Sequence, residues 1–106
     1  MAQRVFLLNT LRESADPAEY EDWIRRVDYP IARSQASILS YVVIRLDGHV
    51  GDATGPLPAE YVEVIDITDI DEYRADPPKD PDFQRLMEEW RQFVEHSTMV
   101  YGEVIE

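Results

Sequence analysis

The segment Tyr20–Arg33, with the sequence YEDWIRRVDYPIAR, predicts an amphipathic helix that is interrupted by a proline. Its apolar residues recur at helical spacing and form one stripe, made of Tyr20, Trp23, Ile24, Val27 and Ile31. Pro30 lacks a backbone N–H and disfavours helical angles at the preceding residue, so the helix should loosen around Asp28 and Tyr29. A carboxylate, a phenol and an indole meet at this irregularity, where we expect a small-molecule site.

Strands and helices alternate along the rest of the chain. Apolar runs predict strands at Arg4–Leu11, Ile38–Leu46, Tyr61–Thr68 and Thr98–Glu106. Asp16-Pro17 and Asp80-Pro81 each place a capping carboxylate before a proline, so a helix should start at each pair. The second of these helices should end near His96, and a shorter helix should follow Asp69.

The predicted order is strand, helix, strand, strand, helix, strand, which is typical of a ferredoxin-like α+β fold. Such a βαββαβ domain, here residues 1–106, has an antiparallel sheet of four strands with helices on one face. Both faces of the predicted strands are apolar, and monomers rarely expose so large an apolar surface. We therefore expect a homodimer in which two sheets pack into a barrel-like core. The segment Asp47–Glu60, rich in glycine and proline, should be an exposed loop that acts as a lid or a dimer contact.

Composition excludes several classes of function. The 106 residues carry 22 acidic and 10 basic side chains, a formal charge of −12, so nucleic acid and anionic membranes are poor partners. The absence of cysteine excludes disulfides and thiolate chemistry and fits a cytoplasmic protein. No apolar run has the length of a signal peptide or a membrane span. Since no metal-ligand spacing or phosphate-binding loop occurs, we expect neither a metal nor a cofactor.

Three segments carry a resemblance to a known family. The W-x4-D-Y-P element at 23–30, the YVEVI strand at 61–65 and the closing GEVI at 102–105 resemble RedY-like proteins, which are associated with prodigiosin-type red pigment biosynthesis. The resemblance extends from Val5 to Ile105. It implies the dimeric α+β barrel superfamily, which also holds cofactor-free monooxygenases of antibiotic biosynthesis, polyketide cyclases and isomerases. It therefore implies a homodimer and a role in secondary metabolism.

His96 and Asp28 are the candidate catalytic residues. Imidazole exchanges protons near neutral pH, and His96 should lie at the end of the last helix, where it either faces a cleft or caps the helix. Asp28 adjoins Trp23 and Tyr29, and desolvation there would raise its pKa and suit it to acid–base work. The alternative for Asp28 is a solvated side chain that closes the turn. The other histidine, His49, should be exposed in its loop.

The candidate substrate-binding residues are either aromatic residues or charged residues within predicted strands. Glu63 and Arg45 share a strand face with Tyr41 and Tyr101, and charges there are costly unless paired. They form either a buried pair across the dimer interface or part of a cavity wall. The aromatic candidates are either walls of a flat pocket or simply core residues: Tyr20, Trp23, Tyr29, Trp90 and Tyr101.

The leading functional hypothesis is a small cofactor-independent protein of secondary metabolism. It would hold an aromatic, pyrrole- or indole-like intermediate between helices and sheet, and promote condensation, cyclisation or dehydration by acid–base chemistry. The alternatives are a non-catalytic carrier for such an intermediate, a cofactor-free monooxygenase, and a purely structural dimer.

Overall fold

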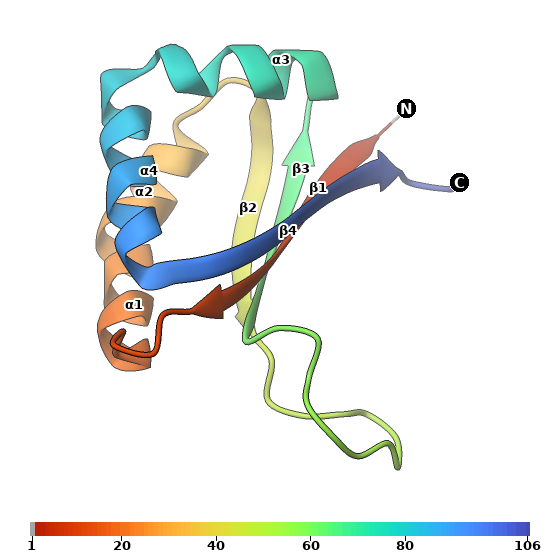
Figure 1. Cartoon of the computed structure of the whole chain (residues 1–106). Coiled ribbons are helices and arrows are strands. Elements are labelled where there is room, and N and C mark those ends of the chain that lie inside the picture. Colours follow the sequence, from red (N-terminus) through yellow and green to blue (C-terminus); the bar gives the residue numbers. More distant parts are fainter. Residues whose placement is uncertain (1) are drawn as a thin grey trace.

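A four-stranded antiparallel sheet with the strand order β2-β3-β1-β4 forms the centre of the molecule. The structure is a computed structural model that describes residues 2–106. Its elements in chain order are β1 (Gln3–Leu11), α1 (Pro17–Trp23), a π-helical turn (Ile24–Asp28), α2 (Tyr29–Arg33), β2 (Ile38–Arg45), β3 (Tyr61–Ile67), α3 (Ile70–Ala75), a 3-10 turn (Pro77–Lys79), α4 (Pro81–Phe93) and β4 (Val94–Glu103). The helices cover one face of the sheet (Figure 1), so the predicted ferredoxin-like fold is confirmed.

The register of the sheet assigns each strand residue to one of two faces. Val5 of β1 lies opposite both Ile65 of β3 and Tyr101 of β4, and directly opposed residues point to the same face. This face packs against the helices and is buried on β1 and β3. The other face, which we call the free sheet face, is partly exposed and has Arg4, Ser40 and Asp66 at one end. Its apolar residues are Phe6, Leu8, Val42, Ile44, Val62, Val64 and Val100.

Three aspartates cap the helices as predicted. Asp16, Asp69 and Asp80 each accept a hydrogen bond at 2.8–3.0 Å from a backbone N–H in the first turn of α1, α3 or α4. These bonds satisfy donors that a helix start would otherwise leave unpaired, so the cap positions set where each helix begins.

An aromatic cluster joins α1 to the sheet and to α4. The Tyr20 ring lies 6.0 Å from that of Trp23, 5.0 Å from that of Tyr61 and 5.3 Å from that of Phe93. Tyr20 and Trp23 are buried, and aromatic contacts at these distances add to the free energy of burial. The cluster therefore packs α1 against both the sheet and α4.

The helix loosens at Asp28 as predicted, but the backbone at Tyr29 differs from the expectation. Tyr29 keeps helical angles, with φ −57° and ψ −50°, although it precedes a proline. Its backbone N–H bonds to the carbonyl of Ile24, five residues back, which makes the segment before it a π-helical turn. The missing N–H of Pro30 then falls in the first turn of α2, where it costs little. Asp28 ends the wide turn and is only 1% exposed.

The boundary between α4 and β4 lies earlier than predicted. α4 ends at Phe93, and Val94 already has extended angles of φ −97° and ψ 120°. The pairing of β4 with β1 continues to Leu11 across an irregularity after Thr10, so sheet hydrogen bonds claim a segment that the periodicity had assigned to the helix. His96 is therefore a strand residue and does not end a helix.

The outer edge of β2 is closed by α2. The guanidinium of Arg33 donates to the Tyr41 carbonyl at 2.9 and 3.1 Å, and the Val43 N–H donates to the Tyr29 hydroxyl at 3.0 Å. These bonds occupy backbone groups that an edge strand leaves free.

The loop between β2 and β3 stands away from the sheet (Figure 1), and Val50 within it is fully exposed. This confirms the exposed loop predicted there. No helix in the stretch 2–106 is long and apolar enough to cross a membrane.

Candidate functional site

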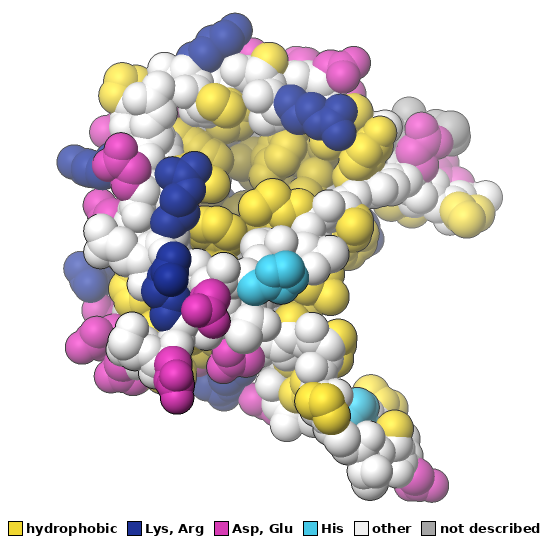
Figure 2. All heavy atoms as spheres, viewed as in Figure 1, with side chains coloured by type: hydrophobic (Ala, Val, Ile, Leu, Met, Phe, Trp, Pro, Cys, Tyr) yellow, Lys and Arg dark blue, Asp and Glu magenta, His cyan; other side chains and the backbone are white. Residues whose placement is uncertain are grey.

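A cavity of about 520 Å³ opens between the helix layer and the sheet. Figure 2 shows an apolar hollow between the helices and β4, with basic side chains at its rim. The apolar lining includes Leu7, Ala32, Ile38, Pro77, Phe83, Leu86, Met87, Trp90 and Met99. The polar lining comprises Asp28, Tyr41, Glu63, Tyr73, Arg74, Gln84, Glu88 and Arg91. An apolar pocket with a few convergent polar groups is the usual form of a small-molecule site.

Three buried oxygen-bearing side chains meet at the wall of this cavity. The hydroxyl oxygen of Tyr41 lies 2.9 and 3.1 Å from the two carboxyl oxygens of Asp28. The same hydroxyl lies 2.5 Å from Oε1 of Glu63. The π-helical turn brings Asp28 to this point, and the shared strand face brings Tyr41 and Glu63. We refer to these residues as the Asp28–Tyr41–Glu63 network.

Two further donors hold Glu63. The Asn9 side-chain amide donates to Oε2 of Glu63 at 2.5 Å, and the Trp90 indole N–H donates to the same oxygen at 3.2 Å. Glu63 is only 3% exposed, and a buried carboxylate is tolerated where several donors replace its lost water. These contacts favour the ionised form of Glu63 and oppose the effect of its burial.

The geometry of the network is best explained if one of its two carboxyl groups is protonated in addition to the Tyr41 hydroxyl. Tyr41 has one O–H to donate, yet its oxygen lies within hydrogen-bond distance of both carboxyl groups. Both contacts are satisfied when one carboxyl is protonated and donates to the Tyr41 oxygen. Burial raises the pKa of Asp28 to about 8, and the neighbouring Glu63 charge adds to this rise. Burial raises the pKa of Glu63 too, but three donors counter it, so we assign the proton to Asp28.

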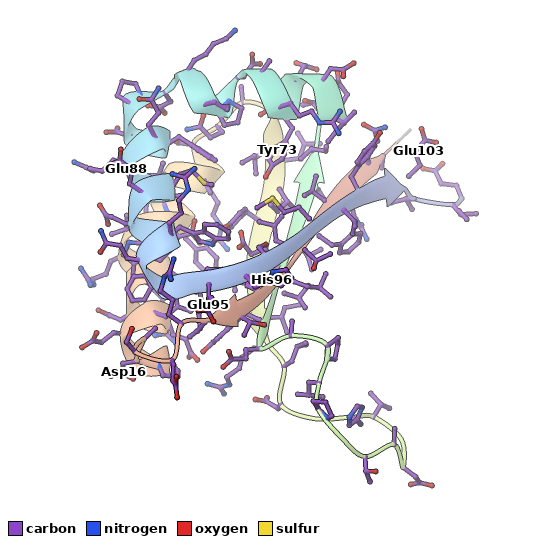
Figure 3. All side chains as sticks on the ribbon, in the orientation of Figure 1. Asp16, Tyr73, Glu88, Glu95, His96 and Glu103 are labelled. Atoms are coloured by element: carbon purple, nitrogen blue, oxygen red, sulfur yellow. The ribbon has the colours of Figure 1, made fainter. Side chains whose placement is uncertain are left out.

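Both tyrosines of the cavity remain protonated. Burial raises the pKa of Tyr41 well above its usual value, with the charges of Glu63 and Asp28 adding to the rise. Burial also raises the pKa of Tyr73 to about 12. Figure 3 shows Tyr73 beneath α3, toward the space between the helices and the sheet. The cavity thus presents a buried acid that can exchange its proton near neutral pH, beside phenols that cannot be deprotonated there.

Asp28, Glu63 and Trp90 are the sequence-predicted site residues that the structure brings together at the cavity. Of the two alternatives predicted for Asp28, the structure shows the desolvated carboxyl and not the solvated one. Glu63 is buried within one chain with Tyr41, Asn9 and Trp90, so it does not need a cationic partner to be satisfied.

His96 is not brought to the cavity. It lies opposite Thr10 in the β1–β4 register, which puts it on the side of the sheet away from Asp28. It is exposed, and its Nε2 lies 3.4 Å from the Thr98 hydroxyl. Figure 3 shows it on β4. His96 and Asp28, which the sequence analysis paired, therefore lie on different sides of the sheet.

The remaining predicted residues also lie outside the cavity lining. Tyr20 and Trp23 belong to the aromatic cluster, and Tyr29 packs under the Arg33 guanidinium at 3.8 Å. Tyr101 shares the helix-facing side of β4 but is half exposed, with the Arg74 guanidinium 5.4 Å above its ring.

Arg45 is exposed and forms ion pairs with Glu21 and Asp47, each at 3.0 Å. Within the protomer, Arg45 is therefore neither buried nor paired with Glu63. The cause is position, because Arg45 is the last residue of its strand and its long side chain reaches solvent.

Sequence reasoning had not assigned site roles to Tyr41 or Asn9. Both carried a usable signal. Asn9 is a polar residue within an apolar strand, and Tyr41 has the same strand face as Glu63. Alternation gives the face of a residue but not its cross-strand neighbour, which depends on register. Among residues 2–106, no group of three or more His, Asp or Glu side chains is placed to hold a metal ion.

The fold and the cavity define the class of protein. An antiparallel sheet of four strands with helices on one face and an apolar free face is the architecture of ferredoxin-like, dimeric α+β barrel proteins. The family model described as REDY-like protein HapK matches residues 3–105. The chain belongs to this REDY-like family. A search of curated proteins finds no match.

Solved structures with the same fold include HapK from Hahella chejuensis, which is 25% identical, with a TM-score of 0.78 over 97% of this chain and 92% of that chain. SnoaB from Streptomyces nogalater, a cofactor-independent oxygenase, is 19% identical, with a TM-score of 0.72 over 99% and 94%. A dimeric ferredoxin-like protein of unknown function from Thermobifida fusca is 17% identical, with a TM-score of 0.71 over 98% and 92%. The last two likenesses show the fold alone.

Proposed function

We propose that the protein is a cofactor-independent enzyme of secondary metabolism that carries out an acid–base step on an aromatic, pyrrole- or indole-like intermediate. The observation that carries this proposal is the buried Asp28–Tyr41–Glu63 network at the wall of an apolar cavity. Membership of the REDY-like family supports the metabolic setting. The reaction class is condensation, cyclisation or dehydration.

The ligand is proposed to lie against the aromatic and aliphatic side of the cavity. Phe83, Met87 and Trp90 supply flat or adaptable apolar surface, which suits a planar ring system. Exclusion of water by such a wall strengthens each polar interaction with the reacting atoms. The ring would thus be held with its polar substituent toward Asp28.

Asp28 is proposed to serve as the acid and then as the base. In a dehydration, its proton passes to the departing hydroxyl, which leaves as water. The carboxylate that remains takes the proton that the substrate loses from the adjacent carbon or nitrogen, so the acid is restored. Tyr41 and Glu63 position Asp28 and set its pKa, which lies close to the pH at which the exchange must work.

We also propose that the working form is a homodimer joined through the free sheet face. That face exposes apolar residues on both edge strands, with Val42 at 42% and Ile44 at 48% on β2 and Val100 at 50% on β4. Proteins that stay monomeric seldom leave such a surface uncovered. One relative of the same fold is described as dimeric.

Turnover tests the acid–base proposal. Purified wild type is incubated with a panel of pyrrole and indole carbonyl compounds, each with a nucleophilic pyrrole, in air and under argon, and products are followed by mass spectrometry. We expect product under both atmospheres and a loss of about 100- to 10,000-fold in Asp28→Asn, which keeps the shape but cannot exchange the proton. Asp22→Asn is the matched control, because Asp22 is exposed on α1 and paired with Arg26.

Other outcomes favour the alternatives. Saturable binding without product after long incubation would support a carrier. Product that appears only in air would support a cofactor-free monooxygenase. Turnover that is equal in Asp28→Asn and wild type would overturn the role given to Asp28.

A further inference from the structure

The cavity mouth carries two arginines that lack an acidic partner. Arg74 on α3 and Arg91 on α4 both line the cavity. Within residues 2–106, neither forms an ion pair with a carboxylate. The Arg74 guanidinium lies over the Tyr101 ring, and Arg91 contributes its backbone carbonyl to a hydrogen bond from Arg12. Their guanidinium donors are therefore available at the mouth.

This is unusual in so acidic a chain. With 22 acidic residues against 10 basic ones, most basic side chains find a carboxylate: Arg4, Arg25, Arg26, Arg45, Lys79 and Arg85 each form an ion pair. Arg12 and Arg33 are further exceptions, and each donates to a backbone carbonyl, that of Arg91 and that of Tyr41. The two guanidinium groups that remain, those of Arg74 and Arg91, both belong to the lining of one cavity, although they come from different helices.

The local charge favours an anion at the mouth. Glu88 is the acidic residue there, and Figure 3 shows it on α4. The deeper Glu63 charge already has hydrogen-bond donors. The formal charge of −12 opposes an anionic ligand only weakly, because charges beyond about 8 Å are screened at physiological ionic strength. Two guanidinium groups of the lining carry more charge than one exposed carboxylate.

We propose that the natural ligand is a planar aromatic molecule with an anionic group, such as a carboxylate, which Arg74 and Arg91 bind at the mouth while the ring enters the apolar cavity. This deepens the proposed function and relies on its binding site. Guanidinium forms paired, charge-assisted hydrogen bonds with carboxylates, so the two arginines would set both orientation and selectivity. The anionic end would face outward and the reacting end would face Asp28.

Naphthoate and its uncharged amide, naphthamide, form a probe pair of nearly equal shape. Isothermal titration calorimetry gives the Kd of each with wild type, Arg74→Gln, Arg91→Gln and the double variant. We expect naphthoate to bind wild type about five- to tenfold more tightly than naphthamide, since contacts at an exposed rim are partly screened. The double variant should lose this preference and keep its Kd for naphthamide. Arg85→Gln is the matched control, because Arg85 lies on α4, pairs with Glu89 and is outside the cavity lining.

The salt dependence of the wild-type Kd gives a second measurement that needs no variant. The preference for naphthoate should shrink as salt is raised from 0.05 to about 0.5 M, because screening weakens the charge interaction. Equal Kd values for the two probes, or a preference that survives in the double variant, would overturn the inference. So would failure of both probes to bind at millimolar concentration. The acid–base proposal is decided separately by Asp28→Asn turnover on charged and uncharged substrates.

Discussion

The two faces of the sheet are built from the same strands but have opposite character. The helix-facing side buries Asn9, Tyr41 and Glu63 among apolar residues and borders the cavity. The free sheet face holds apolar residues at the alternate positions, and they are partly exposed. On β3, Glu63 points to one face while its neighbours Val62 and Val64 point to the other. A single strand of seven residues thus supplies both an interior acid and an apolar outer surface.

The helix-facing side contains groups that reduce the stability of the fold, and the free sheet face does not. Buried polar groups cost free energy unless every atom finds a partner. Next to the network, the Asn9 side-chain carbonyl and the Tyr20 hydroxyl are buried without a hydrogen-bond partner among residues 2–106. The free sheet face carries no such cost and would gain from a covering copy. Local costs of this kind are typical of sites that serve function, which fits the roles proposed for the two faces.

Removal of Glu63 should have the largest effect on stability. Glu63→Ala leaves the donors of Asn9 and Trp90 buried without their acceptor, removes one of the two carboxyl partners of Tyr41 and opens a small cavity. We expect the free energy of unfolding to fall by about 3–5 kcal/mol, measured by urea denaturation. Glu63→Gln, which keeps an acceptor oxygen, should lose less. Glu88→Ala at the exposed mouth is the control and should change stability by about 0.5 kcal/mol or less. A loss of similar size in both alanine variants would show that the network does not bear on stability.

Stability should also fall as pH rises through the window set by Asp28. The folded pKa of Asp28 is about 8, above its usual value of 3.8, so the folded state keeps a proton that the unfolded state loses between these values. Raising the pH across this window therefore favours unfolding, and the effect saturates above about pH 8. The total is on the order of a few kcal/mol, since each pKa unit corresponds to about 1.4 kcal/mol.

Urea denaturation at pH 5 and pH 9 measures this effect. Burial also raises the pKa of Glu63, so this residue contributes a pH dependence of stability with the same sign. The difference between wild type and Asp28→Asn therefore isolates the contribution of Asp28. Asp28→Asn should show a smaller loss between the two pH values. An equal loss in the variant and in wild type would contradict the raised pKa.

Most of the fold could be predicted because its signals are local. The capping aspartates, the alternation within β3 and the apolar stripe of α4 each depend on residues close together in the chain. The order of strands and helices along the chain followed from them, and parity put Glu63 on the same strand face as Tyr41. The end of α4 could not be predicted, because pairing with β1 decides it, and that contact is distant in sequence.

The site was harder to predict because it depends on register and on one irregular turn. Asp28 was predicted as a site residue because it lies just before Pro30. The backbone distortion that brings it to Tyr41 is a π-helical turn, and Tyr29 stays helical. His96 was paired with Asp28 because the helix was extended too far. Had the strand been extended back to Val94, parity with Thr98 would have put His96 on the other face from Tyr101.

A charge on the free sheet face should weaken association without harm to the cavity. Val42→Lys adds an ammonium group at a position that is 42% exposed in the protomer, so the protomer can tolerate it. In the proposed dimer the charge would be desolvated, and we expect the dimer Kd to rise about 100-fold, measured by sedimentation velocity. Ala18→Lys on the exposed surface of α1 is the control and should leave association unchanged. A wild-type protein that is monomeric at micromolar concentration would contradict the assembly role of this face.

The smallest effect should come from Tyr41→Phe, and it decides which carboxyl holds the proton. In the assigned arrangement the neutral Asp28 carboxyl donates to the Tyr41 oxygen while Tyr41 donates to Glu63, so removal of the hydroxyl should lower the pKa of Asp28 by about one unit. A carbon-13 NMR titration of the aspartate carboxyls measures this, with Asp28→Asn used to assign the signal. Tyr73→Phe is the control, because Tyr73 lines the cavity and no hydrogen bond joins it to either carboxyl within residues 2–106. A rise in the pKa of Asp28 would contradict this arrangement, because it would mean that the Tyr41 hydroxyl stabilises the Asp28 anion more than it accepts a bond from the neutral acid. The helix-facing side would then still differ from the free sheet face, but its acid would be held neutral by burial alone and not by the phenol.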